Sequence, residues 1–269
     1  ILARKPGDSA ADDNFFTPSG ILACNPLTIT DFRKLLIDIA EVKNAWLEVA
    51  TDQTDFCQPH HQQDPAYIRT NHAAKNADYL NGLYHVYIDL ETDLEKKFGE
   101  DEAEKSAYVD RVIKKVRAAL MAHRNLCEDF VDIYILCKQE IGVCADIELQ
   151  DGVDAEKLYL DLVAALRAFF SFSSVFYTLQ QLLDKNTPIE EIFAGRPYNL
   201  KESHGFVDTV ELEALQLRKE IHLSDVYNAL FQVPGINSIR GLSLKACKNT
   251  PRPPDKGWKY SIPKNHVPE

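Results

Sequence analysis

The sequence predicts an α+β fold built from two tandem α/β units, and three observations support this prediction. The stretch TITDFRKLLIDIAEVKNAWLEV near the start has the same shape as HLSDVYNALFQVPGINSIRGLSL, which begins 194 residues later. Each stretch is typical of a capped helix of about ten residues that leads directly into a strand. Between the two copies lie segments with the alternation of strands and the apolar spacing of amphipathic helices. Matched elements at both ends of the chain indicate a duplicated module.

The alignment of the two copies sets Thr30-Asp31 against Ser224-Asp225. Thr30 and Ser224 are the expected N-caps, because a hydroxyl oxygen accepts the free N–H groups of a first helical turn. Asp31 and Asp225 follow in that turn, where the helix dipole favours negative charge. The aligned apolar positions are Leu36 with Leu230, Ile39 with Val233 and Val42 with Ile236.

The first unit is expected over residues 28–138, after an irregular lead-in over residues 1–27. Apolar residues alternate with more polar ones in GLYHVYIDL, which predicts a strand. A charge-dense connection follows. Apolar residues at helical spacing from Tyr108 then predict an amphipathic helix that ends near Arg124. The stretch FVDIYILC predicts the strand that closes the unit.

The resulting order, helix–strand–strand–helix–strand, is that of a ferredoxin-like unit without its first strand. Residues Phe15–Cys24 are expected to supply the missing strand. A polar insertion, residues 51–80, interrupts the unit after its first strand. Its Gln, Asn and His content predicts a long surface loop.

The second unit is expected over residues 139–247 and is interpreted as ferredoxin-like in derivation too. In IGVCADIEL the odd-numbered residues are mostly apolar, which predicts a strand with one buried face. Asp154 is the expected N-cap of an amphipathic helix, and the second copy of the repeat closes the unit. An insertion at residues 173–220 separates these parts. Within it, TPIEEIF predicts a short helix capped by Thr187, with Pro188 at the first helical position.

The tail, residues 248–269, contains five prolines and predicts an extended arm. Such an arm is expected to contribute little to either core. The insertion at 173–220 carries too many apolar residues for a free loop. Part of it is therefore expected to pack on its parent domain. The insertion and the tail are also expected to form much of the contact with other proteins.

Composition excludes several classes of function. A net charge of −11 and the lack of a Lys/Arg cluster argue against a nucleic-acid-binding surface. No apolar run approaches the roughly 20 residues that span a bilayer, so no integral membrane segment is predicted. The chain opens at Ile1 without an initiator Met, which leads us to expect a fragment of a longer polypeptide. Six cysteines without CxxC spacing favour buried free thiols over a zinc site: Cys24, Cys57, Cys127, Cys137, Cys144 and Cys247.

Two groups of side chains near residue 205 have the residue types of an active site. Ser203, His204 and Asp208 match a hydrolase triad in type, but no GxSxG turn exposes the serine. We expect a loop there and keep a hydrolase as the alternative function. Glu211 and Glu213 have the types of paired glycosidase carboxylates. In the acidic run VELEAL they are expected to be solvated.

The remaining candidate is a metal site in the polar insertion. His60, His61 and Asp64 are possible ligands, and Cys57 lies nearby, but no further ligand has a suitable spacing. Neither GxGxxG nor GxxxxGK[ST] occurs, so no phosphate-binding loop is predicted. The sequence therefore predicts no catalytic, cofactor-binding or metal-binding residues.

A family resemblance rests on the order of several stretches. These are PLTITDFRKLLIDIAEVKNAWLEV, GLYHVYIDLE, RNLCEDFVDIYILCKQEIGVCADIEL, FYTLQQLLDKNTPIEEIFAGRP, HGFVDTVEL and IHLSDVYNALFQVPGINSIRGLSL. The chain resembles the baseplate J-like wedge proteins of contractile phage tails, and in particular the large wedge subunits of related bacterial contractile injection systems. The resemblance covers residues 26–246 and consists of packing and turn signals. It does not distinguish the two related wedge subunits.

The resemblance implies a structural protein and no enzyme. In this family small α/β modules are chained to hold neighbouring wedges at fixed angles around a central hub and tube. The implied partners are a second J-like wedge subunit, copies of the chain itself, the sheath-initiating subunit and the hub or tube. The implied location is the cytoplasm during assembly, and afterwards the baseplate of a phage-tail-like particle.

Overall fold

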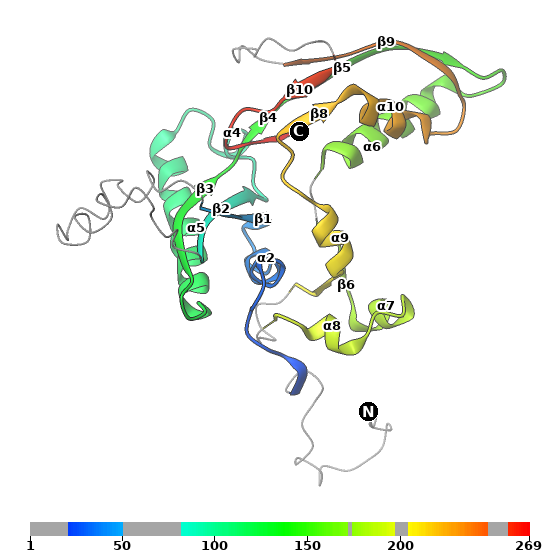
Figure 1. The fold of residues 1–269 in the computed structure, drawn as a ribbon. Helices are drawn as coiled ribbons and strands as arrows, with labels where there is room; N and C mark the ends of the chain where they lie inside the picture. The colour runs from blue at the N-terminus through cyan, green and yellow to red at the C-terminus, as the bar shows by residue number, and fades with distance from the viewer. Residues whose placement is uncertain (1–20, 51–81, 172–173, 197–203, 247–257) are drawn as a thin grey trace, which may run out of the picture.

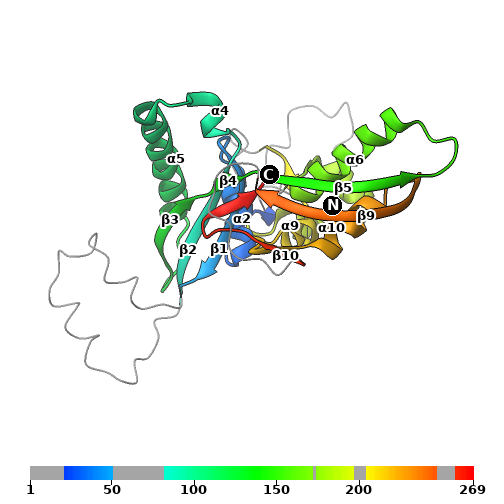
Figure 2. The ribbon, with the colours of Figure 1, turned by 90° about the horizontal axis from the view of Figure 1, so that it is seen from above.

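The computed structural model describes residues 21–50, 82–171, 174–196, 204–246 and 258–269. These residues form a mixed α+β structure of small sheets and helices, as the sequence predicts (Figure 1). Two large hydrophobic cores are present. The residues of the first come from the range Phe32 to Phe130 of the sequence, and those of the second come from the range Ile141 to Ile262. Viewed from above, the elements of the two cores lie side by side (Figure 2).

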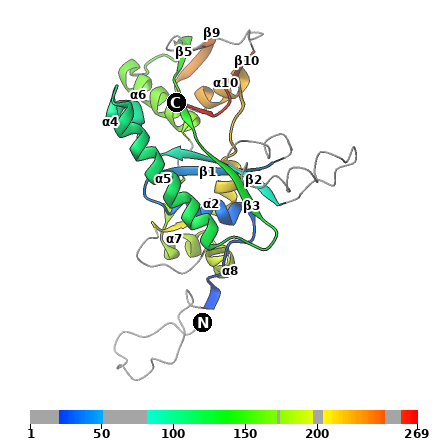
Figure 3. The ribbon, with the colours of Figure 1, turned by 90° about the vertical axis from the view of Figure 1, so that its left-hand side faces the viewer.

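The first core lies between a three-stranded sheet and two helices that pack on the same face of it (Figure 3). Strand β2 pairs antiparallel with β1 and parallel with β3. Helix α5 buries Val112, Val116 and Leu120 completely, because residues three and four apart share one side of a helix. The elements are α2 (Ile29–Ile37), β1 (Val42–Val49), β2 (Leu83–Leu90), α4 (Leu94–Phe98), α5 (Glu102–Ala122) and β3 (Asp129–Ile135).

The charged connection before the predicted helix is itself largely helical. Asp93 caps α4 and Asp101 caps α5, and each aspartate accepts hydrogen bonds from two backbone N–H groups of the next turn. The predicted start at Tyr108 is therefore too late. A strand was expected over Phe15–Cys24, but the described part of that stretch, residues 21–24, forms no strand. The rest of that stretch and the expected loop at 51–80 lie outside the described residues.

The second core lies under the antiparallel pair β5–β9, where α6 and α10 pack together (Figure 1). Asp154 caps α6 as predicted, through the N–H groups of Glu156 and Lys157. The apolar, odd-numbered residues of β5 face this core, and Cys144 and Glu148 face outward and are exposed. The elements are β5 (Ile141–Leu149), α6 (Ala155–Phe170), β8 (Glu220–His222), α10 (Leu223–Phe231) and β9 (Ile236–Ala246).

The repeat recognised in the sequence is exact in the structure, because α10 begins and ends 194 residues after α2, and β9 begins 194 residues after β1. The predicted N-caps are wrong, however. Thr28 caps α2 in a capping box with Asp31, since an acid three residues after the cap is what this motif requires. Ser224 lies inside α10. The helix begins after His222 without a side-chain cap, and the N–H of Leu223 donates to the carbonyl of Trp258.

The tail is part of both units, which corrects the expectation that it contributes little to either core. Strand β10 (Lys259–Ser261) pairs with β8, and Tyr260 and Ile262 are buried in the second core. Strand β11 (His266–Pro268) pairs in parallel with β4 (Cys137–Gln139). Val267 is 1% exposed there and packs against Trp46, Tyr87 and Leu136 on the other face of the first sheet.

The insertion packs on the first unit, although the second unit surrounds it in the sequence. It lies beside α2 in Figure 1, and Ile37 of α2 is buried against Val207 and Leu212. The capping prediction at Thr187 is wrong: α8 begins after Pro188, which takes the cap position without a side-chain hydrogen bond. The elements are β6 (Phe176–Tyr177), α7 (Leu179–Asp184), α8 (Ile189–Phe193), β7 (Phe206–Val207) and α9 (Thr209–Ala214).

Replacing Leu230 with alanine is expected to lower the free energy of unfolding by about 2–5 kcal/mol, the usual range for a buried leucine. Leu230 is 1% exposed and belongs to the second core. Urea denaturation of the purified chain measures the change. The matched control is Leu160→Ala on α6, where the side chain is 66% exposed and the expected change is within about 0.5 kcal/mol. Equal urea midpoints for Leu230→Ala and Leu160→Ala would contradict the assignment of Leu230 to the second core.

Candidate assembly surfaces

Arg33 joins the first sheet to the insertion and is the most highly connected charged side chain of α2. It is 4% exposed. Its guanidinium donates to the carbonyls of Ala45 (2.7 Å), Leu212 (2.9 Å) and Leu215 (2.8 Å), and to Asn44 Oδ1 (3.3 Å). The indole Nε1 of Trp46 donates to the same Leu215 carbonyl at 2.7 Å. The planar fork of an arginine fits this set of acceptors, which a lysine could not span.

The electrostatic state of α2 follows from this burial. Desolvation lowers the pKa of the Arg33 guanidinium to about 10, and Glu213 acts in the opposite direction. The neighbouring Lys34 is 3% exposed, and burial lowers the pKa of its ammonium too, opposed mainly by Asp31. With a pKa of about 10, Arg33 remains charged at neutral pH. The helix therefore presents a buried positive face to the acidic α9.

A second set of contacts fixes the insertion to the end of α2. Asp38 pairs with the guanidinium of Arg196, which also donates to the carbonyl of Gly205. Asp38 Oδ1 accepts the backbone N–H of His204 at 3.2 Å. Gly195 has a positive φ of 69°, and a Cβ there would lie 2.0 Å from the Asp31 carboxylate. Only glycine lets the insertion approach this closely.

The residues of the possible triad have separate structural roles. Ser203 lies outside the described residues. The ring of His204 lies against Phe176, with 5.7 Å between the ring centroids. The Asp208 carboxylate caps α9 by accepting from the N–H groups of Val210 and Glu211, at 3.0 and 3.3 Å. His204 and Asp208 contact different residues, so these contacts support no relay between the two side chains.

Glu211 and Glu213 contact different parts of the protein; Glu213 is exposed, as expected, and the Glu211 side chain is 44% exposed. Glu211 accepts from the Tyr177 hydroxyl at 2.8 Å and from Lys185 Nζ at 2.7 Å. This contact raises the pKa of the Lys185 ammonium above its ordinary value. Glu213 Oε1 accepts from the Thr30 hydroxyl at 3.2 Å. Glu211 therefore joins parts of the insertion to one another, and Glu213 joins the insertion to α2.

The proposed metal ligands His60, His61, Asp64 and Cys57 lie outside the described residues. Within the described part of the chain, no group of three or more His, Cys, Asp or Glu side chains could hold a metal ion. The expectation of buried thiols is wrong for the four described cysteines, which are free and exposed. Cys144 shows the reason, since the outer face of β5 is not covered by another described layer. The four are Cys24, Cys127, Cys137 and Cys144.

The sequence did not reveal the buried roles of Arg33 and Arg196. Charged residues on an amphipathic helix usually lie in solvent, and no local pattern marks the exceptions. A signal was available for α9, where Asp208 precedes a short apolar-periodic stretch and is a typical N-cap.

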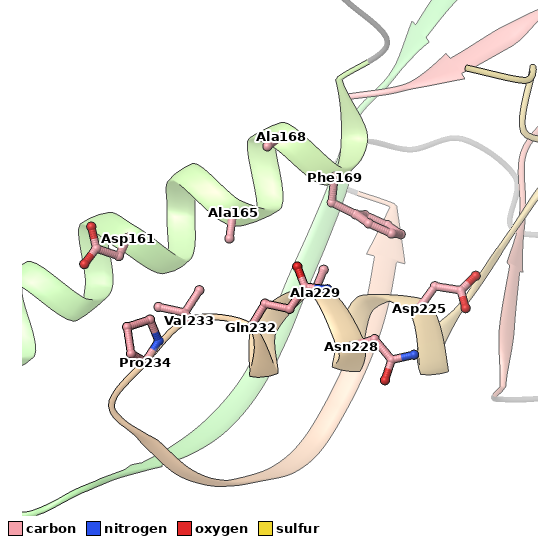
Figure 4. A pocket seen from close by; sticks show the side chains of 10 residues that line it. All are labelled: Asp161, Ala165, Ala168, Phe169, Asp225, Asn228, Ala229, Gln232, Val233 and Pro234. Atoms are coloured by element: carbon pink, nitrogen blue, oxygen red, sulfur yellow. The ribbon is translucent and has the colours of Figure 1, made fainter. Parts of the chain in front are cut away.

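A groove lies between α6 and α10 of the second unit (Figure 4). Its volume is about 590 Å³. Asp161 of α6 and Asp225 of α10 bring two carboxylates to it, and both residues are exposed. The remaining lining residues are Ala165, Ala168, Phe169, Asn228, Ala229, Gln232, Val233 and Pro234.

Comparison with known proteins identifies a shared fold. No family model matches the chain, and no curated protein matches it. Among solved structures, the chain is similar to a chain in the structure of the anti-feeding prophage (AFP) baseplate, with a TM-score of 0.54 and 15% sequence identity. The match covers 94% of this chain and 40% of that chain, so this chain spans less than half the length of the protein it matches. Among the described residues, no helix is long and apolar enough to cross a membrane.

Proposed function

We propose that the chain is a structural subunit of the baseplate of a contractile injection system or phage-tail-like particle, and within it a J-like wedge subunit. The observation that carries the proposal is the fold match over 94% of the chain to a chain of the anti-feeding prophage baseplate. The same class of machine is implied by the order of sequence stretches from PLTITDF to IRGLSL.

The way the two units are joined supports a connector role. The insertion from the second half of the sequence is bound to α2 through Arg33 and Arg196, and the tail adds buried residues to both cores. Shared segments of this kind oppose movement of one unit against the other. A wedge that holds its neighbours at fixed angles needs this rigidity. We propose that both units derive from a ferredoxin-like module.

The partners follow from this role. They are other wedge subunits, among them a second J-like subunit and copies of the chain, together with the sheath-initiating subunit and the central hub or tube. Assembly takes place in the cytoplasm before the chain becomes part of the particle. The role requires no catalytic residue, which is consistent with the use of Asp208 as a helix cap.

The experiment is to tag the full-length chain in the cells that produce it and to purify particles by sedimentation. We expect the chain to sediment with sheath and tube proteins and to map to the baseplate end by immunogold labelling. A chain found as a free monomer while particles assemble without it would contradict the proposal.

A pair of substitutions separates this proposal from the hydrolase alternative. His204→Ala and Asp208→Ala should leave incorporation into particles unchanged, and the loss of the α9 cap should lower the free energy of unfolding by about 1 kcal/mol. A hydrolytic activity of the purified chain that both substitutions abolish would favour the enzyme.

A further inference from the structure

The exposed side of α6 is apolar, whereas the exposed side of α5 is charged. Tyr159 is 67% exposed and Leu160 is 66% exposed. Val163 is half-buried and Ala164 is exposed one turn further on. These four residues share one side of the helix, and we call them the outer stripe of α6. The exposed residues of α5 are mainly charged, among them Asp110, Arg111, Lys114 and Arg117. An apolar stripe in place of such charges indicates a contact surface.

A charged residue lies at each end of this stripe. Glu156 is one turn before the stripe and Arg167 is one turn after it, on the same side of the helix. Both residues are exposed, and within the described part of the chain neither forms a salt bridge. The stripe is therefore acidic at its N-terminal end and basic at its C-terminal end, and each charge complements the helix dipole there.

The order of these charges fits a second copy of the same helix in the antiparallel direction. With a two-fold axis midway between Asp161 and Leu162, Glu156 of each copy comes to lie opposite Arg167 of the other. A parallel pair would set Glu156 against Glu156, which is repulsive. The antiparallel pair also brings opposite ends of the two helix dipoles together. A different protein would need the reverse order of charges, which the chain's own helix supplies by symmetry.

The sizes of the side chains fit the same register. Leu160 comes to lie opposite Val163 of the second copy, and Tyr159 opposite Ala164, so a larger side chain meets a smaller one in each pair. A shallow depression of about 400 Å³ lies at the N-terminal end of the stripe. It is placed to receive the C-terminal half of the stripe of the second copy. Its lining residues are Ala155, Glu156, Tyr159 and Leu160.

We propose that two copies of the chain associate through the outer stripes of α6, antiparallel about a two-fold axis, with the ion pair between Glu156 and Arg167 formed twice. The proposal goes beyond the proposed function and does not depend on it. Helix α6 has 16 residues and is about 24 Å long, so this contact alone is smaller than a standard protein interface. Association is therefore weak, with a dissociation constant between about 1 μM and about 1 mM.

Sedimentation equilibrium of the purified chain, at concentrations from about 10 μM to about 1 mM, measures the association. We expect a reversible monomer–dimer equilibrium. Leu160→Lys should lower the association constant about tenfold or more, because it places a charge at the centre of the contact. The control is Ala107→Lys on the exposed side of α5, which should leave the constant unchanged. A chain that is monomeric at every concentration, or that associates equally well with Leu160→Lys, would overturn the proposal and leave the proposed function intact.

Exchange of the two charges tests whether the partner is a second copy. Glu156→Arg and Arg167→Glu should each weaken association about tenfold, because the two-fold axis turns two ion pairs into two repulsive pairs. The chain with both substitutions regains two ion pairs and should associate within about twofold of the original chain. Glu104→Arg, in the first turn of α5, is the control for the helix-dipole effect. A double variant as weak as either single variant would overturn the proposal.

Disulfide trapping determines the direction of the two helices. A mixture of Glu156→Cys chains and Arg167→Cys chains should form a disulfide between the introduced cysteines under mild oxidation. Glu156→Cys chains alone should not, since the two copies of position 156 lie about 16 Å apart along the helix axis. Mass spectrometry separates this disulfide from any that involve the exposed native cysteines, such as Cys144. Trapping of Glu156→Cys chains with each other in preference to the mixture would overturn the proposal.

Discussion

Replacing Arg33 with methionine should lower the free energy of unfolding by about 1.5–3 kcal/mol or more, the range for hydrogen bonds that involve a charged group. Methionine keeps most of the apolar stem but removes the donors to Ala45, Leu212 and Asn44. Asn44 Oδ1 keeps the N–H of Ala45 at 2.8 Å, and the Leu212 carbonyl keeps the N–H of Leu215 at 3.2 Å, so the expected loss is that of the charge-assisted bonds themselves. The carbonyl of Leu215 keeps the indole N–H of Trp46.

Urea denaturation measures this effect, and two further variants define its cause. Arg117→Met on the exposed side of α5 is the matched control and should change the free energy by less than about 0.5 kcal/mol. Arg33→Lys should recover only part of the loss, because an ammonium cannot reach all four acceptors of the planar fork. If Arg33→Met unfolded at the same urea concentration as Arg117→Met, the Arg33 hydrogen bonds between α2 and the insertion would not contribute to stability.

Deleting residues 258–269 should destabilise both units and leave little folded chain. The deletion removes three buried side chains, Tyr260, Ile262 and Val267, each worth about 1.5–3 kcal/mol when fully buried. It also removes the strands that pair with β8 and β4. The summed loss is comparable to the total stability of an ordinary domain, roughly 5–15 kcal/mol. Circular dichroism and the yield of soluble chain measure the result.

Point variants show which unit each part of the tail supports. Tyr260→Ser should increase hydrogen exchange in β8 and α10, and Val267→Asp should increase it in β4 and around Trp46. Trp258→Ala is the control, since Trp258 is 80% exposed, and it should leave exchange unchanged. A deleted chain that melts at the temperature of the full chain would show that the tail is dispensable.

The sequence predicted the elements whose own residues carry a repeating pattern. The alternation of IGVCADIEL specifies β5, and Asp154 followed by an apolar stripe specifies α6, because these signals are local. The 194-residue repeat likewise predicted that α2 and α10 are equivalent. Cap positions were less predictable: Thr28 and Thr30 are both plausible caps, and only the spacing to Asp31 decides between them.

The contacts between elements could not be predicted, because they join residues far apart in the chain. Nothing near Leu212 indicates that its carbonyl accepts from Arg33, 179 positions earlier. Nothing near Val267 indicates that a proline-rich stretch adds a parallel strand to β4. The roles of Arg33, Arg196 and Glu213 depend on such pairs, and local patterning contains no information about them.

The placement of Val267 has a consequence for synthesis on the ribosome. Trp46 and Tyr87 emerge early, but the residue that covers them is made some 180 to 220 positions later. During that interval one face of the first sheet exposes aromatic side chains, which favour aggregation or binding by a chaperone. Arg33 likewise lacks two of its hydrogen-bond acceptors until Leu212 and Leu215 have been synthesised. The first unit is synthesised first but is completed only when the tail has been made. A prematurely terminated chain therefore exposes apolar surface, by which chaperones and proteases can recognise it.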